Sequence, residues 1–321
     1  MKAAVIHEQG GPDVLVYEEI PDPRPADDEV VLDVSVISLE GGDLLNRRIL
    51  PVEKFPHVIG YAAAGHIAEI GKKVTGLNVG QRVAAFNFSG SHAEKFRAPA
   101  NYVFPVPLGL DLEIAATFPV AYGTAGWALF EAGGLKRGET VFIQGASGGV
   151  GTAAAQLASA AGAIVIGTGL AKACGVMRAN GCDHAIAHDR QDFAQEIATI
   201  TKGRGVDLIV DLVGGDAAMV SKLISTAAYR GRLAVVGLAS GEAPSVAFWD
   251  IVPKNMTIHG VLFGAEMHSR QAHAMMDDYF KRATLGELTM TIDRRFALAD
   301  AAAAHRYVEE KRPAGRVLII P

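Results

Sequence analysis

The second half of the chain alternates short apolar runs with longer segments of helical periodicity. Four continuous apolar runs bounded by turn residues predict buried strands at 140–144, 164–168, 208–211 and 233–237. Helices are expected between them, at about 150–161, 172–180 and 193–201. Buried strands that alternate with helices are typical of a parallel, doubly wound sheet. We therefore expect an α/β domain here.

The first third of the chain has a different pattern, in which short apolar runs are broken by Gly, Pro and Asp. Runs such as 30–34 and 82–86 predict a β-rich domain. The C-terminal tail has two amphipathic stretches, near 271–283 and 299–310, and a last apolar strand at 316–320. We expect this tail to return to the β-rich domain. The expected domains are 1–121, 122–262 and 263–321.

Composition agrees with a folded protein of two domains. The chain has 321 residues, half of them hydrophobic and a fifth charged. Its 30 basic and 35 acidic residues form no long run of one sign, which disfavours a nucleic-acid partner. The two cysteines, Cys174 and Cys182, exclude a disulfide scaffold.

Neither a leader peptide nor a membrane span is expected. The N-terminal apolar run turns polar at His7, too early for a secretory signal, so the cytoplasm is the expected compartment. Residues 140–171 carry no charge, but glycines divide them into pieces too short to cross a bilayer.

The strongest local motif is a glycine-rich turn at 144–151, with the sequence QGASGGVG. It follows a predicted strand and opens a predicted helix, as in dinucleotide-binding sites. Glycines there let backbone N–H groups approach a pyrophosphate, and the helix N-terminus favours the anion. The alternative is a glycine-rich turn without a ligand.

The end of the second predicted strand favours NADPH. An NAD site places an acidic residue there, about twenty residues beyond the motif, to accept a hydrogen bond from the ribose. Here residues 167–169 read GTG, and the first carboxylate after them is Asp183. Lys172 would attract a 2′-phosphate, with Thr168 beside it. The alternative is that Lys172 is an exposed lysine at a helix start.

With these motifs placed, the chain resembles the quinone oxidoreductase, zeta-crystallin-like branch of the zinc-free medium-chain dehydrogenase/reductase superfamily. The resemblance is nearly end to end. It implies a GroES-like β-rich catalytic domain, a Rossmann domain that binds NADPH, a quinone or enone substrate and a homodimer joined through the sheet edge. The stretches that carry it are MKAA at 1–4, GGP at 10–12, GSHAE at 90–94, GTA at 123–125, GASGGVG at 145–151, DLVG at 211–214 and GRV at 315–317.

The resemblance also implies which residues contact the cofactor. Phe263 lies where the family's chain passes the nicotinamide, His188 replaces a tyrosine that helps bind the 2′-phosphate, and Lys311 or Arg312 replaces an arginine. The other matching positions are Thr124, Ser147, Gly148, Gly149, Val150, Lys172, Gly237 and Leu238.

No metal site is expected. Related alcohol dehydrogenases bind catalytic zinc through Cys, His and Cys, whereas the matching positions here are Glu40, Tyr61 and Val120. His184 and His188 have the spacing of helical metal ligands, but the residues between them predict a strand.

The acceptor side departs from the family pattern. Where the family usually has an Asn-x-x-Asp motif followed by a tyrosine, this chain has Glu40, Asp43 and Leu45. A position that is usually acidic is Ala62 here. These changes leave the acceptor open. They also motivate an alternative function, a sensor or structural member that binds NADPH without catalysis.

Two residues are candidates for catalysis. Hydride transfer to a quinone or an enone requires stabilisation of negative charge on the acceptor oxygen, which a phenol can provide. Tyr61 is the candidate donor, and an aromatic wall is its alternative role. Asp43 is the second candidate, although Asp43 and Arg47 have the spacing of a structural helical pair.

Overall fold

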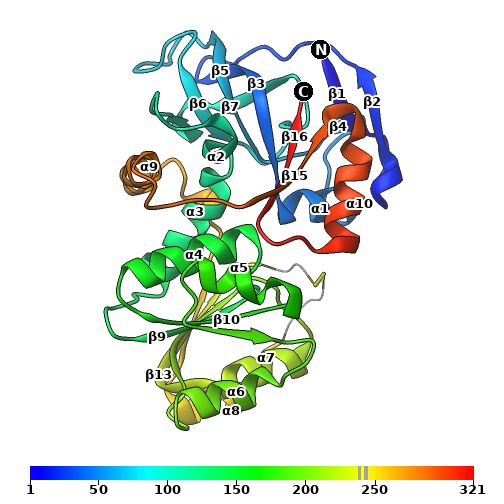
Figure 1. The fold of residues 1–321 in the computed structure, drawn as a ribbon. Coiled ribbons are helices and arrows are strands. Elements are labelled where there is room, and N and C mark those ends of the chain that lie inside the picture. The colour runs from blue at the N-terminus through cyan, green and yellow to red at the C-terminus, as the bar shows by residue number, and fades with distance from the viewer. Residues whose placement is uncertain (238–239, 242–244) are drawn as a thin grey trace. The chain divides into compact units, whose positions relative to one another are not determined.

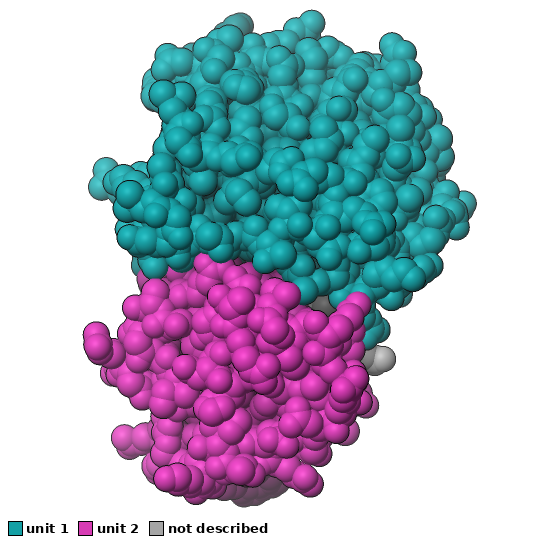
Figure 2. All heavy atoms as spheres, viewed as in Figure 1, with its two compact units in different colours: residues 1–123, 264–321 teal, residues 124–263 magenta. Residues whose placement is uncertain are grey.

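The computed structural model describes residues 1–237, 240–241 and 245–321 (Figure 1). The chain forms two compact units (Figure 2). Unit 1 comprises Met1–Gly123 and Gly264–Pro321, and unit 2 comprises Thr124–Phe263. The C-terminal tail thus belongs to the same unit as the N-terminal third. None of the helices in the described ranges is both long and apolar enough to cross a membrane.

Unit 2 contains a parallel sheet with the strand order β11-β10-β9-β12-β13-β14. The order reverses direction beside β9, as in doubly wound folds. Its strands are β9 (Thr140–Gln144), β10 (Ile164–Gly169), β11 (His184–Ala187), β12 (Val206–Asp211), β13 (Ala227–Val235) and β14 (Thr257–Gly260).

Helices cover both faces of this sheet. In Figure 1, α4 and α5 lie on one side of it and α6 and α7 on the other. One core cluster joins Phe142 and Ile209 of the sheet to Phe193 of α6 and Leu223 of α7. The helical segments are η3 (Trp127–Ala132), α4 (Gly149–Ala160), η4 (Ala171–Ala173), α5 (Cys174–Ala179), α6 (Phe193–Ile200), α7 (Ala217–Ser225), α8 (Phe248–Ile251) and η5 (Val252–Lys254).

Most elements predicted for unit 2 are confirmed, whereas α7, α8 and β14 were not predicted and β13 differs in its bounds. The prediction started this strand at residue 233, whereas it begins at Ala227. Its first half carries polar and exposed side chains at Tyr229 and Arg230, which do not follow the apolar pattern of a buried strand. Arg230 also has a positive φ of 62°, and the pairing with β12 shifts register before Leu208.

Unit 1 is β-rich, as expected. A seven-stranded sheet has the order β15-β16-β3-β5-β6-β8, with β7 paired to β3, and a three-stranded sheet has the order β2-β1-β4. The strands are β1 (Lys2–Ile6), β2 (Leu15–Glu19), β3 (Glu29–Leu39), β4 (His57–Val58), β5 (Ala62–Ile70), β6 (Arg82–Phe86), β7 (Lys95–Pro99), β8 (Val103–Pro105), β15 (Ile292–Ala297) and β16 (Arg316–Ile320).

Unit 1 also contains helices, and the tail helix α10 (Ala301–Lys311) packs Ala301 and Ala304 into a core cluster of this unit. The two tail helices are confirmed as α9 and α10. The helical segments are η1 (Pro12–Val14), α1 (Gly41–Arg48), η2 (Ala100–Tyr102), α2 (Leu112–Ala115), α9 (Arg270–Thr284), η7 (Leu298–Asp300) and α10 (Ala301–Lys311), while α3 (Phe118–Gly126) and η6 (Phe263–Ala265) run across the two unit boundaries.

The last strand completes the sheet of unit 1 from the far end of the sequence. β16 pairs antiparallel with β3, with Leu318 opposite Ser38, and parallel with β15. This pairing brings Arg316 to the end of β3, where α1 begins. A side chain from the C-terminus therefore meets the segment that carries Glu40 and Asp43.

Candidate functional site

The glycine motif of unit 2 forms the turn between β9 and α4. Gly145 has a φ of +83°, which favours glycine, and Gly148 is the N-cap of α4. No side chain caps this helix, so the N–H groups of its first turn are available to an anion. This arrangement is the one expected for a pyrophosphate site.

The glycines of this turn have different structural roles. A Cβ on Gly151 would lie 2.2 Å from the carbonyl oxygen of Gly145, so Gly151 permits close packing of α4 on the turn. A Cβ on Gly148 would have a single neighbour, the oxygen of Gly145 at 3.6 Å, which is an ordinary contact. The space above Gly148 is therefore open, and this position can hold the backbone close to a ligand.

The expected 2′-phosphate residues lie at the carboxyl ends of two neighbouring strands. Lys172 is exposed in η4, which follows β10. His188 is exposed directly after β11, and its N–H donates to the oxygen of Gly169 at 3.1 Å. β10 and β11 are adjacent and parallel, so both side chains emerge at the same edge of the sheet.

Asp189 also lies at this edge, and sequence reasoning missed it. Its Oδ1 accepts a hydrogen bond of 2.9 Å from the N–H of Ala171, beside Lys172. The sequence criterion for an NAD site concerns the segment after the second strand, whereas Asp189 follows the third strand. Its position two residues after the predicted strand at 185–187 was the signal available.

Thr168 accepts hydrogen bonds from the glycine-rich turn. Its side chain is buried, and its Oγ1 accepts from the N–H of Gly145 at 3.4 Å. Its carbonyl accepts from the N–H of Ala146 at 2.9 Å. The predicted contact of Thr168 with cofactor stays a prediction.

The remaining predicted cofactor residues are distributed over both units. Gly237 approaches Leu212 closely, since a Cβ would lie 2.5 Å from the oxygen of Leu212. Phe263 is buried against Trp127, with ring centroids 5.6 Å apart. Thr124 lies in α3, and Lys311 is the last residue of α10 in unit 1. Ser147 precedes the N-cap of α4, and Gly149 and Val150 are the first two residues of this helix. Leu238 lies outside the described residues.

In unit 1 a buried cluster of charges surrounds the start of α1. Glu40 and Arg316 form an ion pair, and Ser38 Oγ donates to Glu40 Oε1 at 2.7 Å. Asp43 Oδ2 accepts from the N–H of Glu40 at 2.8 Å, which caps the helix. These contacts hold the first turn of α1 against the start of β16.

Burial raises the pKa of both carboxyl groups in this cluster. For Glu40 the charge of Arg316 opposes the effect of burial. The pKa of Asp43 is raised well above its usual range, because the negative charge of Glu40 adds to burial. Asp43 is fully buried, and its predicted catalytic role stays a prediction.

The predicted pairing of Asp43 with Arg47 is wrong. Arg47 donates instead to the oxygen of Gly10 and forms an ion pair with Glu309 of α10 at 2.5 Å. The helical spacing was compatible with a pair, but the carboxylate of Asp43 turns back to cap its own helix. A partner 262 residues away in sequence could not be identified from spacing alone.

Tyr61 immediately precedes β5 and packs on the first turn of α1. A Cβ on Gly42 would lie 2.1 Å from Cε2 of Tyr61, so the ring covers this glycine. The ring also makes edge contacts with Phe86 and Phe88, at centroid distances of 5.7 and 6.4 Å. These contacts make Tyr61 part of an aromatic cluster.

Burial also affects the phenol of Tyr61. Burial raises its pKa to about 12, with a further contribution from the charge of Asp43, while a hydrogen bond with the Asn46 side chain acts in the opposite direction. The hydroxyl therefore keeps its proton near neutral pH. The aromatic packing and the donor role are compatible in the same side chain.

The positions that would hold catalytic zinc lack a suitable ligand set. Glu40 is engaged by Arg316, Tyr61 is a protonated phenol and Val120 has no donor atom. His184 lies in β11, so its spacing to His188 is not helical. Across residues 1–237, 240–241 and 245–321 no group of three or more His, Cys, Asp or Glu side chains could hold a metal ion.

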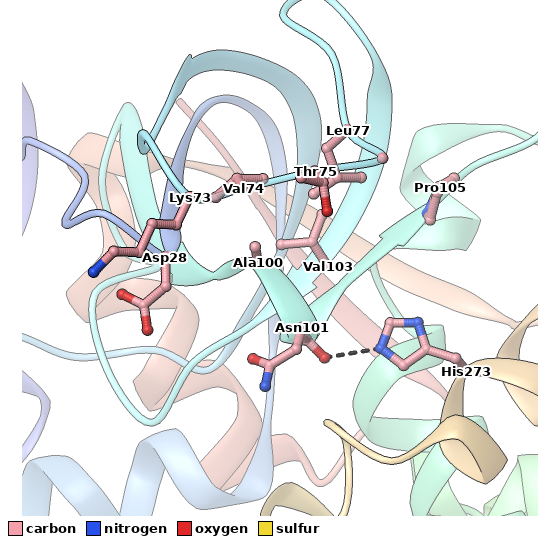
Figure 3. Close-up of a pocket in the computed structure, with 11 residues that line it drawn as sticks. Asp28, Lys73, Val74, Thr75, Leu77, Ala100, Asn101, Val103, Pro105 and His273 are labelled. Carbon is pink, nitrogen blue, oxygen red and sulfur yellow. Dashed lines mark hydrogen bonds between the residues drawn. The ribbon is translucent and has the colours of Figure 1, made fainter.

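A separate cavity of about 470 Å³ lies in unit 1 (Figure 3). His273 of α9 points into it and bonds through Nε2 to the backbone oxygen of Asn101 at 2.8 Å. None of the predicted site residues lines it. Its lining residues are Asp28, Lys73, Val74, Thr75, Gly76, Leu77, Ala100, Asn101, Val103, Pro105 and His273.

Comparison with known families matches both units. Residues 26–108 match the alcohol dehydrogenase GroES-like domain, and residues 149–278 match the zinc-binding dehydrogenase family. A 2-haloacrylate reductase from a Burkholderia species is 32% identical over 99% of this chain and 98% of its own length. A quinone oxidoreductase from Pseudomonas aeruginosa is 30% identical over 97% of each chain.

The chain belongs to the quinone oxidoreductase branch of the medium-chain dehydrogenase/reductase superfamily. A solved mycobacterial structure of this fold, complexed with NADPH, superposes with a TM-score of 0.93 at 28% identity and covers 100% of both chains. Membership confirms the expected GroES-like domain and the Rossmann domain. The chain is thus an oxidoreductase of this family.

Proposed function

We propose that this protein is an NADPH-dependent reductase that transfers hydride to a quinone or another conjugated carbonyl. The observation that carries the proposal is the uncapped N-terminus of α4 with open space above Gly148. It is a preformed anion site at the carboxyl end of a parallel sheet. Relatives named for quinone and 2-haloacrylate reduction support the reaction class.

The choice of NADPH over NADH rests on the edge formed by β10 and β11. Lys172 and His188 emerge there, and the segment after β10 offers no carboxylate to the ribose. The NADPH complex of the mycobacterial relative agrees with this assignment. Ser147, Gly148, Gly149 and Val150 would hold the pyrophosphate through backbone N–H groups.

The residues of unit 1 serve the acceptor. When bound, NADPH supplies the hydride. The phenol of Tyr61 donates a hydrogen bond to the carbonyl oxygen of the acceptor and stabilises the negative charge that develops there. Asp43 positions Tyr61 indirectly, because it caps α1, the helix on which the Tyr61 ring lies.

The proposed reaction uses no metal. Glu40, Tyr61 and Val120 do not form a zinc site, so the oxygen of the acceptor is stabilised by hydrogen bonds alone. Elemental analysis of the purified protein, together with assays before and after chelation, tests this statement. Stoichiometric zinc, or activity that chelation removes and zinc restores, would overturn it.

The alternative is an NADPH-binding protein without catalysis. The test measures NADPH oxidation with benzoquinones, naphthoquinones and enones, alongside a calorimetric titration of NADPH. Oxidation with at least one acceptor supports the reductase. Tight binding of NADPH without oxidation by any acceptor favours the sensor or structural role, and absence of binding rejects both.

We further propose a homodimer that forms through the edge of the unit 2 sheet. β14 is the edge strand, and Phe248 and Trp249 in the preceding α8 are each 79% exposed. An unpaired strand and exposed aromatic rings are features of an interface. Sedimentation equilibrium should give twice the chain mass, and Trp249→Glu should shift the protein toward the monomer.

A further inference from the structure

The cavity of about 470 Å³ in unit 1 has walls that are joined by backbone hydrogen bonds (Figure 3). The N–H of Ala100 donates to the oxygen of Asp28 at 3.0 Å, and the N–H of Lys73 donates to the oxygen of Asp27 at 2.7 Å. The volume lies within the range of small-molecule sites, roughly 300–1,000 Å³. Because these segments are already connected, binding of a ligand would require little ordering of the protein.

Part of the cavity lining is apolar. Val74, Leu77 and Ala100 line the cavity and pack against a core cluster of unit 1. Val103, a member of that cluster, and Pro105 add to this surface. The apolar body of a ligand would be removed from water here, which is the main favourable contact in most small-molecule pockets.

The polar side chains of the lining offer hydrogen-bond acceptors. The side chains of Asp28, Thr75 and Asn101 form no hydrogen bond or ion pair with residues 1–237, 240–241 or 245–321. Each carries an oxygen that can accept a hydrogen bond, and an ionised carboxylate can only accept. A ligand that donates several hydrogen bonds would therefore have partners in this cavity.

His273 provides a further acceptor. Its Nε2 lies 2.8 Å from the backbone oxygen of Asn101, which can only accept, so Nε2 carries the proton. In the neutral ring Nδ1 is then an acceptor, and it has no hydrogen-bond partner within the described part of the chain. The ring also packs on Phe104, with centroids 4.8 Å apart, and this contact fixes its orientation.

The charges at the cavity favour a cation. Of the two charged side chains in the described lining, Lys73 is paired with Asp27 at 3.1 Å, whereas Asp28 has no ion pair. A cation would be attracted by Asp28 without disturbing the pair. An anion would have to separate Lys73 from Asp27 and would be repelled by Asp28.

We propose that this cavity is a second ligand site, which binds a small organic ammonium ion with an apolar or aromatic body. The ammonium group donates to the carboxylate of Asp28 and to neighbouring acceptors of the lining, and the body lies on Val74 and Leu77. The cavity belongs to unit 1 alone, and none of the residues assigned to NADPH or to the acceptor lines it. The site therefore goes beyond the proposed reductase function.

The first test compares three probes of similar shape and different charge, which are benzylamine, benzyl alcohol and benzoate. Each is titrated into the whole protein, and the backbone N–H signals are followed by NMR. Benzylamine should bind most tightly, by up to about fivefold over benzyl alcohol, and should shift the signals of Gly76 and Asn101, which line the cavity. Equal or absent binding of the probes, tightest binding of benzoate, or shifts confined to residues outside the cavity would overturn the proposal.

The second test changes the charge of the lining in both directions. Asp28→Asn should weaken benzylamine binding by up to about fivefold and leave benzyl alcohol nearly unaffected, because the charge is lost and the shape is kept. Asn101→Asp should tighten benzylamine binding, because it adds a second carboxylate. Neither side chain bonds to any of the described residues, so both variants should fold as the wild type does.

Asp33→Asn is the matched control for Asp28→Asn. Asp33 is exposed on β3 in the same unit and does not line the cavity. Equal losses of benzylamine affinity in these two variants, or weaker binding to Asn101→Asp, would reject the assignment of Asp28 as the partner of the ammonium group.

A third measurement keeps this inference distinct from the reductase proposal. NADPH should not displace benzylamine, and Asp28→Asn should leave the dissociation constant of NADPH unchanged. Methylammonium, which lacks the apolar body, should bind more weakly than benzylamine. Displacement by NADPH, or equal affinity for methylammonium, would overturn the site, whereas failure of every acceptor to oxidise NADPH would reject only the reductase.

Discussion

His92 and His305 share a hydrogen bond in the core of unit 1, with their Nε2 atoms 3.0 Å apart. Both side chains are fully buried. Arg47, which can only donate, lies 3.1 Å from Nδ1 of His305, so His305 carries its proton on Nε2 and donates it to His92. His92 is then protonated on Nδ1, facing Ser91 Oγ at 3.4 Å. The pair is neutral and has one defined tautomer.

This pair predicts a loss of stability in mild acid. Burial lowers the pKa of His92 from 6.5 to about 3, and burial with the neighbouring His92 and Arg47 lowers the pKa of His305 well below its ordinary value. Both folded-state pKa values lie below the unfolded-state values. The contribution of the neutral pair to the free energy of unfolding is therefore present above about pH 6.5 and is lost as pH falls toward the folded-state pKa values. Each histidine should contribute a slope of about 1.4 kcal/mol per pH unit once the unfolded state is protonated.

Urea unfolding measured from neutral pH down to about pH 5 tests this prediction above the range in which most carboxylates titrate. His92→Asn should flatten the dependence of the unfolding free energy on pH. The control is His66→Asn, because His66 is exposed and should leave the slope unchanged. A wild-type protein whose stability is constant over this range would contradict the neutral pair.

The two glycines at the start of α4 should respond differently to substitution. Gly148→Val should fold normally, since its φ of −78° and ψ of 175° are extended and the space is open, but should lose NADPH binding. Gly151→Ala should unfold more easily by about 1–3 kcal/mol, because its Cβ would meet the oxygen of Gly145. Thermal unfolding and calorimetric titration separate the effects, and unchanged NADPH affinity in folded Gly148→Val would identify the loop as only a turn.

Local patterns predicted the Rossmann unit well because its strands are buried on both faces. β9 has the predicted bounds, and α4 begins one residue before the prediction. The early part of β13 was missed because Tyr229 and Arg230 are exposed there. Where a strand leaves the core, its sequence no longer carries the apolar signal.

The site in unit 1 was less predictable because its contacts join distant parts of the chain. Tyr61 and Asp43 were found from family positions, but nothing local indicated that Arg316 would neutralise Glu40. Likewise, the link from Asn46 to Phe88 spans 42 residues and depends on backbone geometry. Such partners become visible only when strands and helices are assembled.

Lys172 should determine much of the cofactor preference. We expect NADPH to bind more tightly than NADH by roughly tenfold to a hundredfold, the effect of one charge-assisted contact. Lys172→Asp should reverse much of this preference, since it removes attraction to the 2′-phosphate and adds an acceptor for the ribose hydroxyl. Dissociation constants must be compared at one ionic strength, because salt screens the contact. A wild type that prefers NADH would show that the phosphate lies elsewhere.

Asp189 should weaken the preference for NADPH over NADH, and replacing Asp189 should strengthen this preference. Its carboxylate accepts from the N–H of Ala171, beside Lys172, and so places a negative charge at the edge assigned to the 2′-phosphate. Asp189→Asn keeps an oxygen that can accept this hydrogen bond while it removes the charge. We expect NADPH to bind up to about fivefold more tightly to the variant, the scale of one exposed charge interaction, with NADH affinity nearly unchanged.

Asp183→Asn is the control, because Asp183 bonds to the N–H of Val165 near the start of β10, the strand that ends before η4. The gain should shrink at high salt. If both variants alter NADPH affinity equally, or if Asp189→Asn weakens it, Asp189 acts by ordering the η4 turn rather than through its charge.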